Sequence, residues 1–207
     1  MSYSDYYMGE FLEKVLADPQ LENTIIAITP DHGINYYAPH NIDTQNQTYE
    51  DLVWIPIALI GKKWNRSFGV DDEVRQLADI GPTILDRLGI NVPNSFVGHS
   101  LLSSHGVRLA RAFFQNSNGG LSAGVREGKW KFWMFFETGK KYLFDLETDR
   151  QESENLADDE DKSALVARLS EMVQSVYARN TLLIRDNRIY DPKHSGMSTK
   201  KDKINSR

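Results

Sequence analysis

The chain contains no cysteine. Neither a disulfide framework nor a thiol nucleophile is therefore available, although an absence of cysteine is compatible with any cellular compartment. The chain also lacks a run approaching the roughly 18 apolar residues that a membrane-spanning helix needs. Residues 1–5 have neither the basic stretch nor the apolar stretch of a secretory leader, so we expect no signal peptide here.

An excess of positive charge is missing as well. The 24 Lys and Arg residues are outnumbered by 29 Asp and Glu residues, which gives a formal net charge of −5. This balance argues against a protein whose main partner is nucleic acid. Apolar residues are plentiful, since 40% of the 207 residues are hydrophobic and 11% are aromatic. The chain can therefore bury a core, as one large domain or as a domain with a small appendage.

The most informative segment is residues 23–33, an apolar run that ends in Asp31, His32 and Gly33. An isoleucine-rich run without polar alternation predicts a strand over 24–29 that is buried on both faces of a parallel sheet. Open α/β sheets bind ligands at the carboxyl ends of such strands. A carboxylate and a neutral imidazole both bind metal ions, and glycine permits a sharp turn beside them. Taken alone, an Asp-His-Gly triplet is more often an ordinary turn. The surrounding sequence therefore decides whether these residues are read as a metal site.

Helices and a second strand surround this run. The expected elements are a helix over 6–17, a strand over 53–60 and a helical stretch over 70–88. Pro56 favours an edge position or irregular pairing for the second strand. Pro82 implies a break in the helical stretch, most simply a second helix that begins near Asp79 with proline in its first turn. Between the strands, the polar segment 34–51 is expected to be a long loop, and such loops often carry function.

The second half of the chain has a different character. Short β-prone segments alternate with Gly, Asn and Ser, which is typical of an antiparallel meander. The expected strands cover 109–114, 121–126, 129–136 and 141–145. Basic and aromatic residues alternate in 129–133, which favours a half-buried strand over a nucleic-acid stacking surface. A long helix is expected over 158–190, with the acidic residues 158–161 in its first turn, where negative charge is favourable.

Six separated segments then agree, in order, with one family. They are 5–12, 23–33, 49–57, 79–90, 98–102 and 126–157. Together they resemble the C-terminal half of a sulfatase-type enzyme of the alkaline phosphatase superfamily. That group includes arylsulfatases, phosphonate monoester hydrolases and the lipoteichoic acid synthase or phosphoglycerol transferase branch. Each segment alone is weakly specific, whereas their shared order is strongly specific.

The resemblance implies a fold and a division of the chain. The fold class is α/β, part of an alkaline phosphatase-like mixed sheet flanked by helices, followed by a small C-terminal antiparallel sheet and a closing helix. Residues 1–105 would form the C-terminal portion of the α/β core, and residues 106–190 the small sheet with its long helix. The polar tail 191–207 is expected to be disordered.

The resemblance also implies a site. Asp31 and His32 would be ligands of a divalent metal ion, with Ca or Mn expected first and Zn or Mg possible. His40 is the candidate for contact with a sulfate or phosphate oxygen, and a solvated loop histidine is the competing interpretation. The family's nucleophile and remaining ligands lie in an N-terminal half that is missing here, and no Cys-x-Pro-Ser-Arg motif exists in this chain. A departure is Arg150, because the family often has proline after the aspartate equivalent to Asp149.

The functional hypothesis follows from that implied site. The chain would be the C-terminal part of a metal-dependent sulfatase-like hydrolase of sulfate or phosphate esters, inactive without the missing N-terminal half. One alternative is a fragment of a phosphoglycerol transferase whose parent is anchored in the membrane only through absent segments. A second alternative is a non-catalytic binding module. The parent would act in the periplasm or at the extracellular face of the membrane.

Overall fold

The computed structural model describes residues 2–34, 48–63, 73–91, 96–102, 111–117 and 120–186. The chain divides into two compact units. One unit comprises Met1–Ile34 and Asp51–Asp72, and the other comprises Asn35–Glu50 and Glu73–Arg207. The expected domain boundaries stay a prediction, and the tail 191–207 lies outside the described residues.

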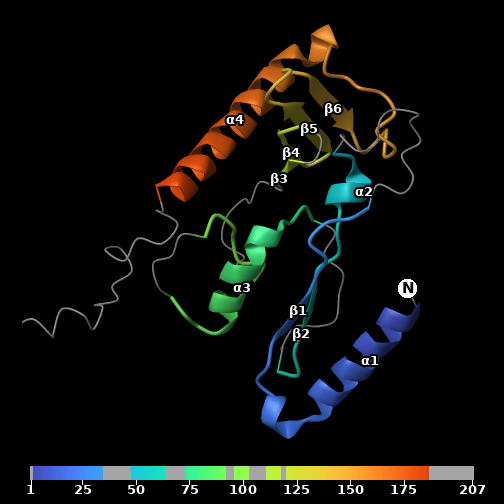
Figure 1. Ribbon diagram of the computed structural model, residues 1–207, viewed down its shortest axis with the longest axis vertical. Coiled ribbons are helices and arrows are strands. Elements are labelled where there is room, and N and C mark those ends of the chain that lie inside the picture. The colour runs from blue at the N-terminus through green and yellow to red at the C-terminus, as the bar shows by residue number, and fades with distance from the viewer. Residues whose placement is uncertain are drawn as a thin grey trace, which may run out of the picture. The chain divides into compact units, whose positions relative to one another are not determined.

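The first unit contains a helix and a two-stranded sheet (Figure 1). Helix α1 spans Ser2–Ala17 and is followed by the short 3₁₀ helix η1, Pro19–Leu21. Strand β1, Ile26–Ile28, pairs antiparallel with β2, Ala58–Ile60. The four-residue helix α2, Glu50–Val53, begins at the last residue assigned to the other unit.

The expectation of a doubly buried parallel strand is wrong for β1. Ala27 is exposed, and Ile26 and Ile28 are only half-buried. Within the described residues β2 is the only strand paired with β1, and it runs antiparallel. The apolar sequence indicated a strand, but it does not contain the neighbours that decide direction and burial. Irregularity at Pro56 is confirmed, because the second strand begins only at residue 58.

In the second unit, the expected break at Pro82 is confirmed. A 3₁₀ turn, η3, spans Leu77–Asp79 and leads into α3, Ile80–Arg87, so that proline lies in the first turn of the helix. The helix ends before Gly89, whose φ of +67° is a conformation that favours glycine.

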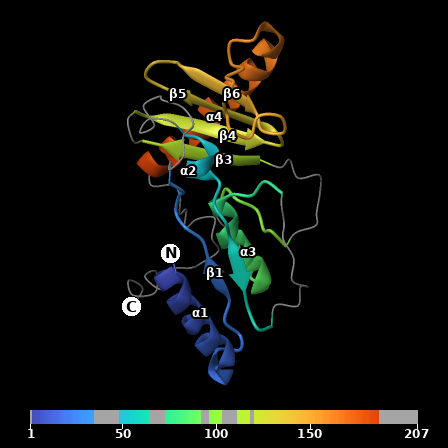
Figure 2. The same cartoon turned by 90° about the vertical axis from the view of Figure 1, so that its right-hand side faces the viewer.

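The antiparallel meander is also confirmed, as a four-stranded sheet of order β3-β4-β5-β6. Its strands are β3 (Arg111–Asn116), β4 (Ser122–Glu127), β5 (Trp130–Phe135) and β6 (Lys141–Asp145). The long helix α4, Ser163–Arg185, lies along one face of this sheet (Figures 1 and 2). It is preceded by the 3₁₀ turn η4, Glu160–Lys162, which holds part of the acidic run.

The core of the second unit has two layers of side chains, one on each face of the sheet. Val125, Phe132 and Leu143 pack with Leu169 and Val173 of α4. On the opposite face, a second cluster consists of Trp133, Tyr142, Phe144, Leu146 and Tyr49. Strand β5 is therefore buried on both faces, and the expectation of a half-buried strand is wrong.

Candidate metal-binding site

Asp31 and His32 lie side by side in the turn that follows β1. Asp31 Oδ2 is 3.8 Å from His32 Nε2, and the two side chains are 90% and 65% exposed. The other carboxylate oxygen, Oδ1, accepts a hydrogen bond of 3.0 Å from the His32 backbone amide. The pair therefore presents one oxygen and one nitrogen toward the same region, accessible from solvent.

A backbone contact selects the ring nitrogen of His32 that can bind a metal. His32 Nδ1 lies 2.7 Å from the carbonyl oxygen of Gly33. A carbonyl oxygen can only accept, so the proton of the neutral ring is on Nδ1 and the lone pair is on Nε2. Metal-ligating histidines in proteins commonly donate their second ring N–H to such an acceptor. Nε2, the ring nitrogen nearer Asp31, is therefore the one whose lone pair can bind a metal ion.

Gly33 in turn is held by α2. Its amide donates a 2.7 Å hydrogen bond to the carbonyl oxygen of Leu52. A Cβ atom at position 33 would lie 1.9 Å from the carbonyl oxygen of Asp51, so no larger residue fits without displacing backbone. Sequence reasoning assigned Gly33 to a sharp turn, whereas the structure shows that close backbone approach is what requires glycine.

These two side chains fit part of a divalent-metal site. A carboxylate oxygen together with an imidazole nitrogen is a donor set suited to Mn²⁺ or Zn²⁺. It is less suited to Ca²⁺, which prefers oxygen ligands. No group of three or more His, Cys, Asp or Glu side chains that could hold a metal ion occurs in the part of the chain that the structure describes. Asp31 and His32 would therefore supply two ligands of a larger set.

Of the other histidines, only His99 lies within the described residues. His40, His105 and His194 lie outside the described residues, so the expected role of His40 stays a prediction. His99 belongs to the other unit, where its backbone amide donates to the Asp79 carboxylate at 2.8 Å.

A buried ionic cluster, which sequence reasoning missed, lies in the second unit. We define it as Lys131, Glu152, Glu50 and Arg126. The Lys131 side chain is 0% exposed, and its Nζ is 2.8 Å from Glu152 and 3.4 Å from Glu50. Arg126 Nη1 is 2.7 Å from the other oxygen of Glu50. The available signal was a lysine inside an apolar strand, Phe132 and Trp133 following it directly.

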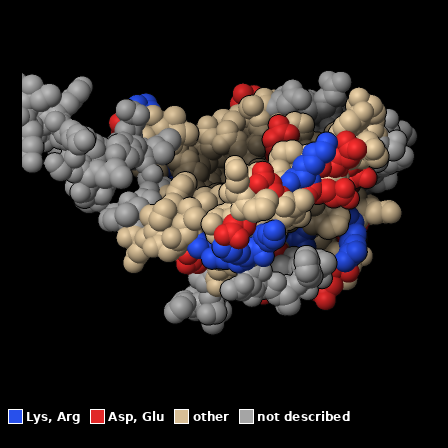
Figure 3. Space-filling view, turned by 90° about the horizontal axis from the view of Figure 1, so that it is seen from below, with Lys and Arg blue, Asp and Glu red and all other residues tan. Residues whose placement is uncertain are grey.

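Burial shifts both partners of the central pair of this cluster toward their neutral forms. It lowers the pKa of Lys131 and raises the pKa of Glu152, and in each case the opposite charge works against the shift. On the face seen in Figure 3, acidic and basic side chains lie beside one another.

A small cavity of about 120 Å³ lies between α4 and strands β3 and β4. Phe113, Phe114 and Tyr177 are among its lining residues, and no charged residue lines it. Among the described residues that line it, Tyr177 is the only one with an ionisable side chain, so the cavity has no pair of catalytic groups.

Comparison with known proteins supports the resemblance. The family model for sulfatases matches residues 1–90. An arylsulfatase of Clostridium perfringens (strain 13 / Type A) is 31% identical over 177 residues, which cover 78% of this chain and 35% of that protein. The matched part of this chain thus spans about a third of the length of that relative.

Solved structures agree at the level of the fold. One is described as a complex with its substrate D-glucosamine-2-N,6-O-disulfate, with a TM-score of 0.66 and 20% identity over 83% of this chain and 37% of that chain. Another is a phosphonate monoester hydrolase of Agrobacterium radiobacter, with a TM-score of 0.63 and 21% identity over 84% of this chain and 39% of that chain. With the ordered motifs, the chain matches the sulfatase family model over residues 1–90, is similar to an arylsulfatase over most of the chain's own length, and shares the fold of the solved sulfatase and phosphonate hydrolase structures.

Proposed function

We propose that the chain is the metal-ligand-bearing part of a metal-dependent hydrolase of sulfate esters. The observation that carries the proposal is the exposed Asp31–His32 pair, whose imidazole is held with Nε2 free to coordinate. A bound divalent cation would supply Lewis acidity, polarising the ester and offsetting charge on its oxygens.

The chain's own residues have defined tasks under this proposal. Asp31 provides a hard oxygen ligand, and His32 provides a nitrogen ligand whose orientation is fixed by the Gly33 carbonyl. Neither acts as the nucleophile, which would come from the missing N-terminal half of the parent. His40 is retained as the proposed contact to a sulfate oxygen. The parent is proposed to act in the periplasm or at the extracellular face.

Sulfate esters are favoured over phosphorus esters by the named relatives, although one neighbour in fold is a phosphonate hydrolase. The test is turnover of a paired aryl sulfate and aryl phosphate by the full-length parent, before and after a chelator removes its metal. We expect turnover of the sulfate, lost with the metal and restored by Mn²⁺ or Ca²⁺. Preference for the phosphate, or activity that survives metal removal, would refute the proposal.

The transferase and the non-catalytic module stay alternative hypotheses. Among the described residues, none of the helices has the length and apolar content of a transmembrane segment. Transfer of a phosphoglycerol group to an acceptor by the full-length parent would support the first alternative. Metal binding without turnover of any ester would support the second.

A further inference from the structure

Two basic side chains face each other across strands β4 and β5. Arg126 and Lys131 are direct partners in the register of these strands, so both side chains lie on the same face of the sheet. Like charges at such positions repel one another and destabilise the pairing. Lys131 is also buried, and a buried charge is costly unless an opposite charge lies beside it. This part of the sheet therefore requires a neighbouring anion.

Glu50 places a carboxylate between the two cations. Its Oε1 is 3.4 Å from Lys131 Nζ, and its Oε2 is 2.7 Å from Arg126 Nη1. The guanidinium is held independently, because Arg126 Nε donates a 2.8 Å hydrogen bond to the carbonyl oxygen of Gly128. Glu152 pairs with Lys131 at 2.8 Å. Without Glu50, Glu152 would be the one carboxylate left beside two cations in the described part of the chain.

The two residues before Glu50 contact the same face of the sheet. Tyr49 is buried, and the centroid of its ring lies 6.3 Å from that of Trp133 and 6.2 Å from that of Phe144. Thr48 is also buried, and its Oγ1 lies 3.4 Å from Ser122 Oγ. Three successive residues thus present a hydroxyl, an aromatic ring and a carboxylate to three matching places on one sheet face.

The backbone of this segment is contacted by a strained residue. Glu152 Oε2 accepts a 2.6 Å hydrogen bond from the Glu50 amide, while Glu152 Oε1 pairs with Lys131. Glu152 has a φ of +54°, a left-handed conformation that is unfavourable for residues other than glycine. Such strain persists where the surroundings hold a residue in place, and it is commonest at binding sites. The strained side chain here is the one that joins the buried cation to the backbone of the segment.

We propose that this face of the sheet is a recognition site for a Thr-Tyr-Glu sequence, and that residues 48–50 of the same chain occupy it. The opposed cations select the carboxylate, and the aromatic rings select the tyrosine. Occupant and sheet belong to one unit of the chain. Docking therefore fixes residues 48–50 of the polar segment that was expected to be a loop. The inference depends on neither metal binding nor ester hydrolysis.

The first test is Glu50→Gln (E50Q) in the whole chain, followed by amide hydrogen exchange in NMR. This change removes the anion between the cations, so we expect the amide at position 50 to exchange at least about tenfold faster. Contacts between the ring protons of Tyr49 and Phe144 should weaken as well. Unchanged exchange and unchanged ring contacts would overturn the proposal.

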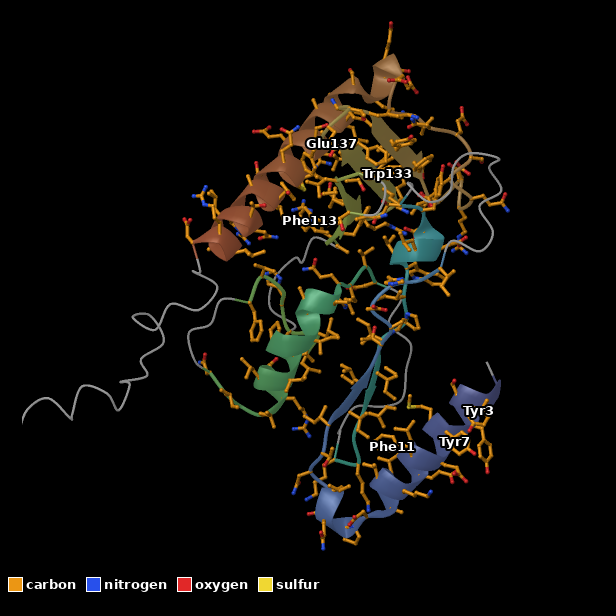
Figure 4. The ribbon with its side chains drawn as sticks, in the orientation of Figure 1. Tyr3, Tyr7, Phe11, Phe113, Trp133 and Glu137 are labelled. Atoms are coloured by element: carbon orange, nitrogen blue, oxygen red, sulfur yellow. The ribbon has the colours of Figure 1, made fainter. Side chains whose placement is uncertain are left out.

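Glu137→Gln is the matched control for E50Q. Glu137 is exposed in the turn between β5 and β6 of the same sheet and is labelled in Figure 4. The substitution removes the same charge at a distance from the two cations. Exchange at Glu50 should therefore stay as in the wild type. Equal acceleration in both variants would refute a specific role for Glu50.

A double variant separates charge selection from general damage to the sheet. E50Q combined with Arg126→Gln removes one of the opposed cations, so that Lys131 and Glu152 remain as a balanced pair. Charge selection predicts that the amide at position 50 regains most of its protection, because the two sites are energetically coupled. This variant also decides if E50Q alone unfolds the sheet. Protection no better than in E50Q would overturn the proposal.

A free carboxylate provides the last test. Glu50→Ala leaves the place of the carboxylate open, so sodium acetate should slow exchange at position 50 more than sodium chloride does at equal ionic strength. In the wild type, where Glu50 occupies the site, the two salts should act alike. Equal effects of acetate and chloride on the Glu50→Ala variant would show that the opposed cations do not select a carboxylate.

Discussion

At the scale of single residues, the geometry around His32 depends on Gly33, whose lack of a side chain permits its close approach to the backbone of α2. The Gly33 peptide both accepts from His32 and donates to Leu52. These two hydrogen bonds hold the turn and the imidazole in one arrangement. The triplet's order could be seen in the sequence, but the contact with residue 51 could not, because it joins segments that are distant in the chain.

Replacing Gly33 by alanine should weaken metal binding. The added Cβ would lie 1.9 Å from the Asp51 carbonyl oxygen, so the turn or α2 must shift and the imidazole loses its fixed orientation. Disturbing a residue that orients a ligand typically lowers metal affinity about 10–100-fold. Calorimetric titration with Mn²⁺ measures the change. Gly9→Ala is the control, since a Cβ there meets nothing within 4 Å and affinity should be unaltered.

The raised pKa of Tyr49 predicts a loss of stability at alkaline pH. Burial, aided by nearby Tyr142 and Glu152, raises its pKa from 10.0 to about 12. Above pH 10 the unfolded chain loses a phenolic proton that the folded chain keeps, so the free energy of unfolding falls as pH rises toward 12. The loss amounts to about 2 kcal/mol. Urea unfolding at several pH values measures it.

Tyr49→Phe provides the comparison for that prediction. It keeps the ring that packs against Trp133 and Phe144 but cannot ionise. We expect its unfolding free energy to decrease less steeply with pH above 10. Identical slopes for the two proteins would show that ionisation of Tyr49 is not responsible.

At the scale of elements, the sequence was most informative where turns and helix ends carry their own signals. The meander and the start of α3 near Asp79 were predicted well, because Gly and Asn permit the backbone conformations of turns and Pro fixes its own φ. The direction and burial of β1 were not, since they depend on which strand pairs with it. The burial of Lys131 was also missed, because its partner Glu152 lies after the next strand and only folding brings the two together.

The contribution of the buried Lys131–Glu152 pair to stability can be tested by replacing its two residues. Lys131→Met alone should lower the free energy of unfolding by about 3–5 kcal/mol, because buried carboxylates lose their cation. Adding Glu152→Met should recover most of that loss. Chemical denaturation of both variants measures the difference. Equal stability of the single and double variants would show that the two residues are not energetically coupled.

At the scale of the whole molecule, the matched part of the chain spans about a third of the length of the arylsulfatase it resembles. Along α1, the side chains of Tyr3, Tyr7 and Phe11 are 75%, 50% and 52% exposed (Figure 4). Strand β1 pairs with only one strand in the described part of the chain. Exposed aromatic faces and open sheet edges favour association, which agrees with the proposal that another part of the parent enzyme completes this fold.

We therefore expect the isolated chain to self-associate. Replacing Tyr7 and Phe11 by glutamate should reduce the associated fraction, because charge on this face opposes its burial. Leu182→Glu is the control, as Leu182 is 46% exposed on α4 and outside this face. Sedimentation velocity measures association. A wild-type chain that stays monomeric at all concentrations would support an independent module instead.

The central claim is that Asp31 and His32 bind one divalent ion together. The most direct measurement is a Mn²⁺ titration of the chain, followed by paramagnetic broadening of backbone amide signals, with Asp31→Ala/His32→Ala and His99→Ala compared in parallel. The account predicts broadening centred on residues 31–33 in the wild type and in the His99 variant, and none there in the double variant. Broadening that persists after both side chains are removed, or that never occurs at this turn, would contradict it.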